Sequence, residues 1–571
     1  MIYDTNVNVS SRRSLTQSLI RLSFLVLVIG FGYFVARFVQ VRLKFRRLKA
    51  QGVPLMPHSF LTGHLHIIAK LTRGLPIDLH PNYISQLIYQ NWRTLFPDRA
   101  SCPGALYVDM WPIAPPLLFI TDAHLANQFI VEPSLPRPPN AKKYLAPLTH
   151  NLDLVSLEGA PWKTWRSRFN PGFSAKNLMT LAPAILDEVV TFADILREHA
   201  GTSEKPNSWG PVFQLETLTT NLTFDVIARA VLDISLNEQR AGPSVLKEAL
   251  VDQLSLCMFD YNILTLPKML SPRRHLSIAR NTAAMRGVLL PAVERSLRPD
   301  RAKETTVRTI VDLAVKAYAE EFHEVAVTPP PDAAFADSVL AQLKIFLFAG
   351  HDTTATAICW LLHSIAEYPD VAERIRQEHV SVFGKTMHAT REKIRQAPHL
   401  LNSLPYTLAV IKETLRIYPG PGGIRSGSAD FFMTDPTNGM RFPTDGFMIW
   451  DGIRSKARAE EQWHRADEFL PERWLVTDQE DALCPGKDSW RVFGLGPRHC
   501  IGQELALMEL KLVVALVIRE MDVECAWEEW DVQNGNAGPK EVVDGERAYQ
   551  NGAGTPHTKD GMPVHVRLRQ P

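Results

Sequence analysis

The chain has 571 residues, of which 45% are hydrophobic, an ordinary share for a folded globular protein that excludes a disordered or collagen-like chain. Lysine and arginine number 62 against 61 aspartates and glutamates, so the net charge of +1 offers no basic excess to hold a nucleic-acid backbone. The six cysteines include no C-x-x-C pair, which excludes a disulfide scaffold and a zinc ribbon.

The first predicted element is an apolar helix over residues 19–39. Twenty-one helical residues span about 32 Å, enough to cross the hydrocarbon core of a bilayer. Six cations and no acid follow between residues 37 and 49, whereas fewer cations precede the segment. The positive-inside rule then predicts a lumenal segment at residues 1–18, a single-pass transmembrane anchor at 19–39 and a cytosolic remainder. A cleaved signal peptide is the alternative, but the apolar stretch is long and no small-x-small cleavage site follows it.

A basic, proline-containing linker is predicted at residues 40–59, where Pro54 and Pro57 favour an extended chain. Beyond it, helical periodicity dominates and no linker divides the chain, so we predict one domain over residues 60–571. Its fold class is mainly α with small β-sheets. Residues 534–561, rich in glycine and polar residues, predict a long surface loop or a hairpin insertion. Strand-like runs stand at residues 105–108, 117–121, 447–450 and 564–568.

The strongest chemical signal is the loop Phe493-Gly-Leu-Gly-Pro-Arg-His-Cys500-Ile-Gly502, which precedes an amphipathic helix. Its glycines favour a tight turn with backbone N–H groups directed at the sulfur, and the helix dipole has its positive end there. Both effects lower a thiol pKa, and a thiolate held in this way suits an axial ligand to haem iron. A buried structural cysteine in a turn is the alternative.

This loop resembles the haem-ligand signature of the cytochrome P450 family, F-x-x-G-x-R-x-C-x-G. Phe493, Gly496, Arg498, Cys500 and Gly502 match every fixed position. The resemblance implies the cytochrome P450 fold and a haem b whose iron is bound by the Cys500 thiolate, with Phe493 beside it. Val492 departs from the pattern, because many members have proline there, and this affects the stiffness of the loop more than ligation.

A second motif, Ala-Gly-His-Asp-Thr-Thr at residues 349–354, lies within a predicted helix over 336–367. Several of its residues are poor helix formers, and Asp-Thr-Thr can also start a helix as a cap. The motif resembles the family's A-G-x-D/E-T. The resemblance implies a kinked helix above the haem, with Asp352 and Thr353 as catalytic residues: Thr353 binds dioxygen by a hydrogen bond and Asp352 relays protons. We expect residues 347–357 to line the substrate pocket.

The third motif is Lys-Glu-Thr-Leu-Arg, in which Glu413 and Arg416 share one helical face. An exposed ion pair, contributing at most about 1 kcal/mol, is the plain interpretation. The resemblance implies instead a buried structural network, in which Glu413 also binds Arg473 of the Pro-Glu-Arg segment.

The fourth motif resembles the family's W-x-x-x-R and places Trp162 and Arg166 on one face of a helix. The resemblance implies that both reach the haem propionates, with Arg498 and Arg425 as further candidates. An ordinary aromatic–cation pair on a helix surface is the alternative.

No flavin or nicotinamide fingerprint occurs in the chain, so electrons are expected from NADPH through a separate NADPH–cytochrome P450 reductase, with cytochrome b5 as a second candidate donor. Four cations near the haem-side motifs either form a docking patch for this partner or belong to a solvated face: Lys163, Arg168, Arg491 and Lys511.

These patterns predict a haem-thiolate monooxygenase of the endoplasmic reticulum membrane that oxidises an apolar organic molecule. The tail, with residues 545–549 and Pro563, resembles members from filamentous-fungal secondary metabolism, which suggests a polyketide or terpenoid intermediate as substrate. Two alternatives stay open: a P450-fold isomerase or dehydratase that acts without dioxygen, and a non-catalytic haem sensor or carrier.

Overall fold

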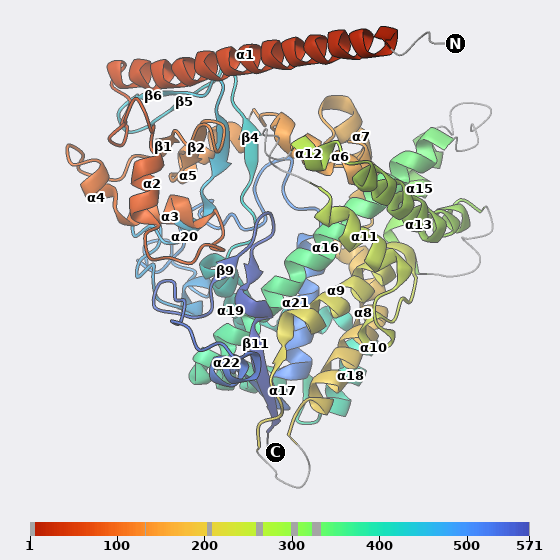
Figure 1. The fold of residues 1–571 in the computed structure, drawn as a ribbon. Helices are drawn as coiled ribbons and strands as arrows, with labels where there is room; N and C mark the ends of the chain where they lie inside the picture. Colours follow the sequence, from red (N-terminus) through yellow and green to blue (C-terminus); the bar gives the residue numbers. More distant parts are fainter. Residues whose placement is uncertain are drawn as a thin grey trace, which may run out of the picture.

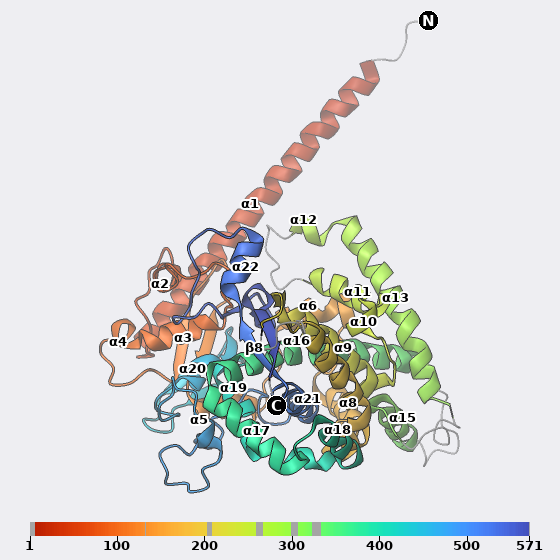
Figure 2. The ribbon, with the colours of Figure 1, turned by 90° about the horizontal axis from the view of Figure 1, so that it is seen from below.

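The computed structural model describes residues 6–131, 133–201, 208–257, 266–298, 307–321 and 333–569, without the side chains of residues 6–16, 19 and 266. A long N-terminal helix lies along one side of a mainly helical body, and small sheets occupy one flank of that body (Figure 1). Seen from below, the N-terminal half of this helix extends away from the body (Figure 2).

The described helices are α1 Asn6–Ala50, α2 Leu65–Leu71, α3 Tyr83–Gln90, α4 Trp92–Leu95, α5 Ala123–Ile130, α6 Pro139–Thr149, α7 Gly159–Phe169, α8 Ala175–Glu198, α9 Leu215–Leu232, α10 Glu238–Ala241, α11 Val245–Ser255, α12 Leu266–Met269, α13 Pro272–Ser296, α15 Ile310–Glu321, α16 Ala333–Glu367, α17 Pro369–Phe383, α18 Met387–Gln396, α19 Pro405–Ile417, α20 Ile453–Ala457, α21 Gln503–Val517 and α22 Trp527–Asn534. Short 3-10 turns are η1 Pro398–Ser403, η2 Pro471–Trp474 and η3 Lys559–Gly561.

The described strands are β1 Ala105–Val108, β2 Leu117–Ile120, β3 Phe213–Gln214, β4 Ile424–Ser426, β5 Phe432–Thr434, β6 Arg441–Pro443, β7 Met448–Asp451, β8 Met521–Cys525, β9 Gln550–Asn551, β10 His557–Thr558 and β11 Pro563–Leu568. They form a sheet of order β1-β2-β7-β4, a sheet of order β3-β11-β8, and the hairpins β5–β6 and β9–β10. The four strand-like runs of the sequence are therefore confirmed.

Helix α16 crosses the centre of the body and packs against α9, α13, α19 and α21. Its apolar residues recur around the whole helix, so it is buried on most sides, as such a pattern requires. It is long and apolar enough to span a membrane by composition, but more than half of its most apolar window lies inside the body. The mainly α fold with small sheets is confirmed, and α16 is its central core helix.

Strands β1 and β2 are buried on both faces, with side chains alternating between two apolar clusters as the period of a strand dictates. Ala105 and Tyr107 join a cluster with the end of α1, whereas Leu106 and Val108 join a cluster with α2–α4. The sheet thereby connects α1 to the body.

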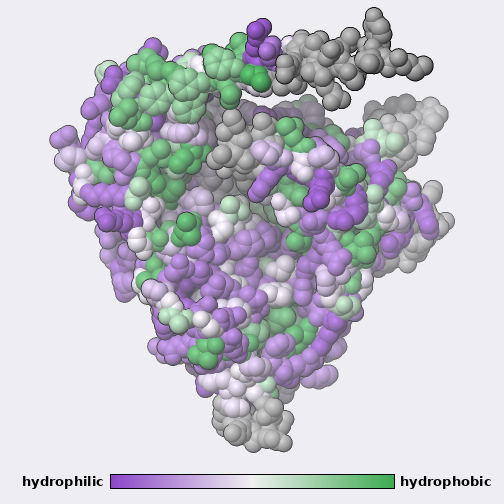
Figure 3. All heavy atoms as spheres, in the orientation of Figure 1, coloured by the Kyte–Doolittle hydropathy of each residue, from purple (hydrophilic) through white to green (hydrophobic). Residues whose placement is uncertain are grey.

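Helix α1 has two different halves. Its apolar residues from Ile20 onward are exposed (Figure 3), and this stretch is a candidate transmembrane anchor. At i, i+4 and i+7, Val41, Phe45 and Leu48 are instead buried against the sheet. The expected linker at residues 40–59 is thus helical as far as Ala50 and packed on the body, so it is no free connector. The domain limits at residues 39 and 59 remain a prediction.

Residues 534–561 form an insertion that is partly folded against the body. They contain the hairpin β9–β10, and Tyr549 is fully buried beside Val543 and Tyr83. Both expectations for this segment hold in part, because residues 535–542 are exposed and outside any helix or strand, whereas residues 550–558 contain the hairpin.

Candidate active site

The loop that carries Cys500 is pressed against the C-terminal end of α5. Gly496 has φ +72°, and a Cβ there would lie 2.9 Å from the Val131 Cα, so glycine is required by conformation and by space. The Cys500 N–H donates to the Phe493 carbonyl at 2.8 Å and closes the loop. Helix α21 begins at Gln503, directly after this turn, and packs against α16.

Cys500 differs from the other five cysteines because it alone is exposed. Cys359, by contrast, is completely buried in α16 with the Thr219 hydroxyl 3.3 Å from its sulfur. Desolvation nevertheless raises the pKa of the Cys500 thiol, against the lowering effects of the Gly502 N–H and the Arg166 charge. The loop N–H therefore lowers this pKa as expected, but desolvation outweighs it in the protein alone, so the net pKa of the thiol is raised. A cation at the sulfur, such as iron, is needed to hold the thiolate.

Within α16, a narrow accessible strip interrupts the burial. Ala349 is exposed and Thr353 and Ala357 are half-buried, at successive intervals of four residues, while Leu347 is fully buried. Only part of the expected pocket lining is therefore accessible. The helix is continuous through the motif, so a helix start at Asp352 is excluded.

Gly350 allows α9 to approach α16 closely. A Cβ at this position would lie 2.8 Å from the Ile227 side chain. Beside this contact, the Thr223 hydroxyl donates to the His351 carbonyl at 2.8 Å, and the Thr353 hydroxyl donates to the Ala349 carbonyl at 2.7 Å. The poor helix formers of the motif therefore occur where a second helix approaches and where hydroxyl groups bond to helix carbonyls.

Asp352 faces a histidine that the sequence did not single out. His557 Nε2 lies 3.7 Å from Asp352 Oδ1, and His557 Nδ1 lies 2.5 Å from Glu216 Oε1 on α9. The N–H of Thr558 donates to the other Glu216 oxygen at 2.8 Å. The hydrogen bond with Glu216, and then the Asp352 charge, raise the pKa of His557. A half-exposed imidazole thus connects two carboxylates from different helices.

Three arginines converge near the cysteine loop: Arg137, Arg425 and Arg498. Burial, followed by their mutual repulsion, lowers the pKa of Arg137 to about 9 and that of Arg425 to about 10. Glu158 pairs with Arg498 and accepts from the Arg137 N–H at 2.8 Å. Arg137 Nε, Arg425 Nε and Arg498 Nη1 are buried and have no hydrogen-bond partner within the described part of the chain. Buried guanidinium groups with free N–H donors fit an anionic group such as the two haem propionates.

Arg137 was not predicted from the sequence. Its position between Pro136 and Pro138, directly before α6, is a weak signal that rigid chain holds a functional side chain.

Trp162 and Arg166 of α7 lie against the same loop. Arg166 Nη1 donates to the His499 carbonyl at 3.0 Å, and the Arg498 guanidinium stacks on the Trp162 ring at 4.5 Å. The structure thus brings Trp162, Arg166, Arg498 and Cys500 together, and it excludes an isolated aromatic–cation pair on a helix surface.

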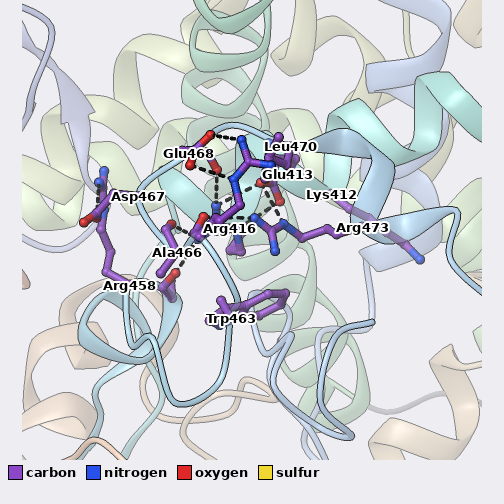
Figure 4. Close-up of polar contacts among 12 residues, drawn as sticks. Lys412, Glu413, Arg416, Arg458, Trp463, Ala466, Asp467, Glu468, Leu470 and Arg473 are labelled. Atoms are coloured by element: carbon purple, nitrogen blue, oxygen red, sulfur yellow. Dashed lines mark hydrogen bonds and ion pairs between the residues drawn. The ribbon is translucent and has the colours of Figure 1, made fainter. Parts of the chain in front are cut away.

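The Glu413 network lies in the core (Figure 4). Arg416 donates to both Glu413 oxygens at 2.9 and 3.0 Å, and Arg473 Nε donates to Oε1 at 3.0 Å. Trp474 and the Leu470 N–H supply further donors at 3.0 and 2.9 Å. Glu413, Arg416 and Arg473 are at most 1% exposed, so the alternative of a surface ion pair is wrong.

The four cations expected to form a docking patch do not form one exposed surface. Arg168 is buried in an ion pair with Glu321, and Arg491 is buried against Asp451. Desolvation lowers the pKa of Lys511, and of the four cations only Lys163 is exposed. Two of the four cations therefore stabilise the fold through ion pairs and cannot contribute to a docking surface.

A thiol just before a helix start, an accessible strip on the helix packed against that helix, and three guanidinium groups that each keep one unpaired nitrogen among the described residues are the features expected of a haem-thiolate protein. The cytochrome P450 family model matches residues 106–542. The chain is 37% identical over 554 residues to cytochrome P450 monooxygenase polC of Polytolypa hystricis, which covers 95% of this chain and 94% of that protein. It is 30% identical over 530 residues to cytochrome P450 monooxygenase acrF of Aspergillus aculeatus, covering 89% and 100%.

Among solved structures, the crystal structure of cytochrome P450DA heme domain superposes with a TM-score of 0.65 at 16% identity, covering 91% of this chain and 98% of that one. The chain therefore belongs to the cytochrome P450 family. It is a monooxygenase, an oxidoreductase, and the family implies a haem cofactor with a cysteine thiolate ligand.

Proposed function

We propose that this enzyme binds haem b with Cys500 as the axial iron ligand and oxidises an apolar organic substrate. The observation that supports this most strongly is that the loop of the one exposed cysteine carries Arg498, which lies near Arg137 and Arg425, and that each of these arginines has a buried nitrogen without a partner among the described residues. The haem supplies the activation of dioxygen when it is bound. Arg137, Arg425 and Arg498, with Trp162 and Arg166, offset and orient its propionates.

Replacement of Cys500 by alanine tests this assignment. The reduced carbon-monoxide difference spectrum of the variant should lose the red-shifted Soret band that thiolate ligation produces. Cys484→Ala, at a half-buried cysteine that precedes the loop, is the matched control and should keep the band. A band that persists in Cys500→Ala would refute the ligand assignment.

Proton delivery in this proposal passes through Asp352. A doubly protonated His557 can release its Nε2 proton to the Asp352 carboxylate 3.7 Å away, while Glu216 stabilises the charged imidazole from the opposite side. The His557 side chain is 39% exposed, so solvent can return the proton. Thr353 lies one residue beyond Asp352 on the accessible strip, where its hydroxyl can hold a proton near the substrate.

Two variants separate these roles. Thr353→Ala should keep haem but divert electrons to peroxide, which lowers the product formed per NADPH oxidised. His557→Gln should lower the same ratio most at pH values below the raised pKa of the imidazole, where the wild-type ring is protonated, and the difference should disappear as the pH rises through that pKa. An unchanged ratio in Thr353→Ala would remove that residue from the mechanism, and an unchanged pH profile in His557→Gln would remove the histidine.

The proposed substrate is an apolar polyketide or terpenoid intermediate of fungal secondary metabolism. Support comes from the similarity to two fungal cytochrome P450 monooxygenases, polC and acrF, and from the small side chains of Ala349 and Ala357 on the accessible strip. A spectral titration with such scaffolds should shift the Soret band to shorter wavelength, and Ala357→Phe should weaken that response by filling space. A response only to small polar acids would refute this substrate class.

We further propose that α1 anchors the enzyme in the endoplasmic reticulum membrane with the body cytosolic, and that NADPH–cytochrome P450 reductase, with cytochrome b5 as a second candidate, supplies the electrons. The exposed apolar residues of α1 support the anchor. NADPH oxidation that requires both reductase and substrate would distinguish a monooxygenase from an isomerase, a dehydratase or a haem carrier.

A further inference from the structure

A basic groove of about 740 Å³ lies between the C-terminal half of α1 and the hairpin β5–β6, away from the cysteine loop. Its cations come from three distant segments of the chain: Lys44 and Arg47 of α1, Arg99 before β1, and Arg441 of β6. The remaining lining includes apolar side chains, among them Leu48, Phe432, Met440 and Pro443.

The charges of this groove are largely uncompensated. Lys44 lies 4.0 Å from Asp445 Oδ2, the one acid that lines the groove among the described residues. Arg47, Arg99 and Arg441 form no ion pair with any described residue. Arg441 stacks on the Phe432 ring at 4.3 Å, and Arg99 Nη2 makes only a long contact of 3.5 Å with the Gly52 carbonyl. Three free guanidinium groups above an apolar floor suit an anion that carries an apolar part.

The position of the groove along α1 indicates where that anion comes from. Phe34 and Phe38 pack on Trp111 at 4.6 and 5.9 Å, and the neighbouring Leu61 and Ile113 are 77% and 63% exposed. These residues mark the level at which the apolar part of α1 meets the body. Lys44 follows Phe38 by about 9 Å along the helix, and the polar layer of a bilayer is about 5–8 Å deep on each side. The Lys44 end of the groove therefore lies at the outer edge of the headgroup layer, and the rest of the groove extends from there towards the cytosol.

We propose that this groove binds the headgroup of an anionic phospholipid from the cytosolic leaflet. The inference depends on the proposed insertion of α1 in the membrane. The guanidinium groups donate to the phosphate and the headgroup carboxylate, and the apolar floor contacts the glycerol and upper acyl chain. Since a cation near an anionic membrane contributes about fivefold to binding, loss of two arginines should weaken the preference for anionic lipid about 25-fold.

The test uses the full-length, haem-loaded protein in nanodiscs with equal amounts of phosphatidylcholine and phosphatidylserine. Native mass spectrometry then measures which lipid stays bound after release from the disc. The wild type should retain phosphatidylserine selectively, and the double variant Arg99→Gln, Arg441→Gln should lose that selectivity. The double variant Lys385→Gln, Lys393→Gln neutralises two exposed cations at the opposite end of the body, beside α18, and should behave as wild type (Figure 1).

Three outcomes overturn the inference: no lipid selectivity in the wild type, unchanged selectivity in the arginine variant, or equal loss in the control. If inorganic phosphate displaced phosphatidylserine and the groove showed no preference between the two lipids, the groove would be a site for a free anion. That result would also refute the inference. The charge-conserving variant Arg99→Lys, Arg441→Lys should restore most of the preference, and an intact carbon-monoxide spectrum confirms folding. Membrane insertion of α1 is tested separately by carbonate extraction of the wild type. Release of the protein from the membrane would show that the anchor proposal fails, independently of the lipid groove.

Discussion

The buried ion pair between α1 and the body predicts where the anchor can be cut. Arg42 and Asp109 are 1% and 0% exposed, and Arg42 Nη1 donates to Asp109 Oδ2. Arg42 also donates to the Phe60 carbonyl at 2.9 Å and to the Leu61 and Trp111 carbonyls at 3.2 Å each. The His58 Nε2 also lies 2.9 Å from Asp109 Oδ2. Removal of residues 1–45 would delete Arg42 and leave the buried Asp109 carboxylate without its arginine partner, with the His58 contact remaining.

Breaking one side of a buried ion pair costs about 3–5 kcal/mol, and loss of a fully buried phenylalanine such as Phe45 costs a similar amount. Together these losses match much of the stability of an ordinary protein, about 5–15 kcal/mol. A chain that begins at residue 40 should therefore fold and bind haem, whereas one that begins at residue 46 should not. The measurements are haem content and the thermal unfolding temperature of both truncated chains.

Point variants in the full chain check the cause. Arg42→Met should destabilise the protein by about 3–5 kcal/mol, and adding Asp109→Asn should recover part of this loss because no buried charge remains unpaired. Burial alone would raise the pKa of Asp109, but hydrogen bonds from His58 and Arg42 hold it below its ordinary value. Its stabilising effect is therefore present above the unfolded pKa of about 3.9 and is lost as the pH falls through the folded pKa. Equal unfolding temperatures for the two truncated chains would refute this reasoning.

Three further predictions follow from buried or strained positions. Gly496→Ala should abolish haem incorporation because its Cβ would overlap Val131. The control Gly535→Ala, at φ +66° with open space around it, should cost only about 1–2 kcal/mol of backbone strain. Equal haem content in the two variants would contradict this prediction. Glu413→Gln should destabilise by about 3–5 kcal/mol, seen as loss of soluble haem-loaded protein, since two buried arginines lose their counter-ion. His557→Gln should remove a stabilisation that is fully present below pH about 6.5 and is lost as the pH rises through the raised folded pKa, measured by unfolding between pH 6 and 9.

Local sequence determined the parts of this enzyme that depend on short spacing. The glycines before Cys500 follow from the turn that the loop must make, and the Glu413–Arg416 spacing follows from helix geometry. The strands at 105–108 and 117–121 could be predicted because β-branched and aromatic residues alternate or cluster there. Each of these signals is complete within about ten residues.

Tertiary structure alone decided which charges are free and which are paired. Arg168 and Arg491 looked like a docking surface, yet burial and carboxylates from distant segments make them structural. His557, 205 residues from Asp352 in the chain, becomes its neighbour only when the C-terminal hairpin packs on α16. In the same way, Arg42 becomes an integral part of the core only when α1 docks on the sheet. A sequence shows the type and spacing of side chains, but desolvation and charge pairing depend on contacts between residues that folding brings together.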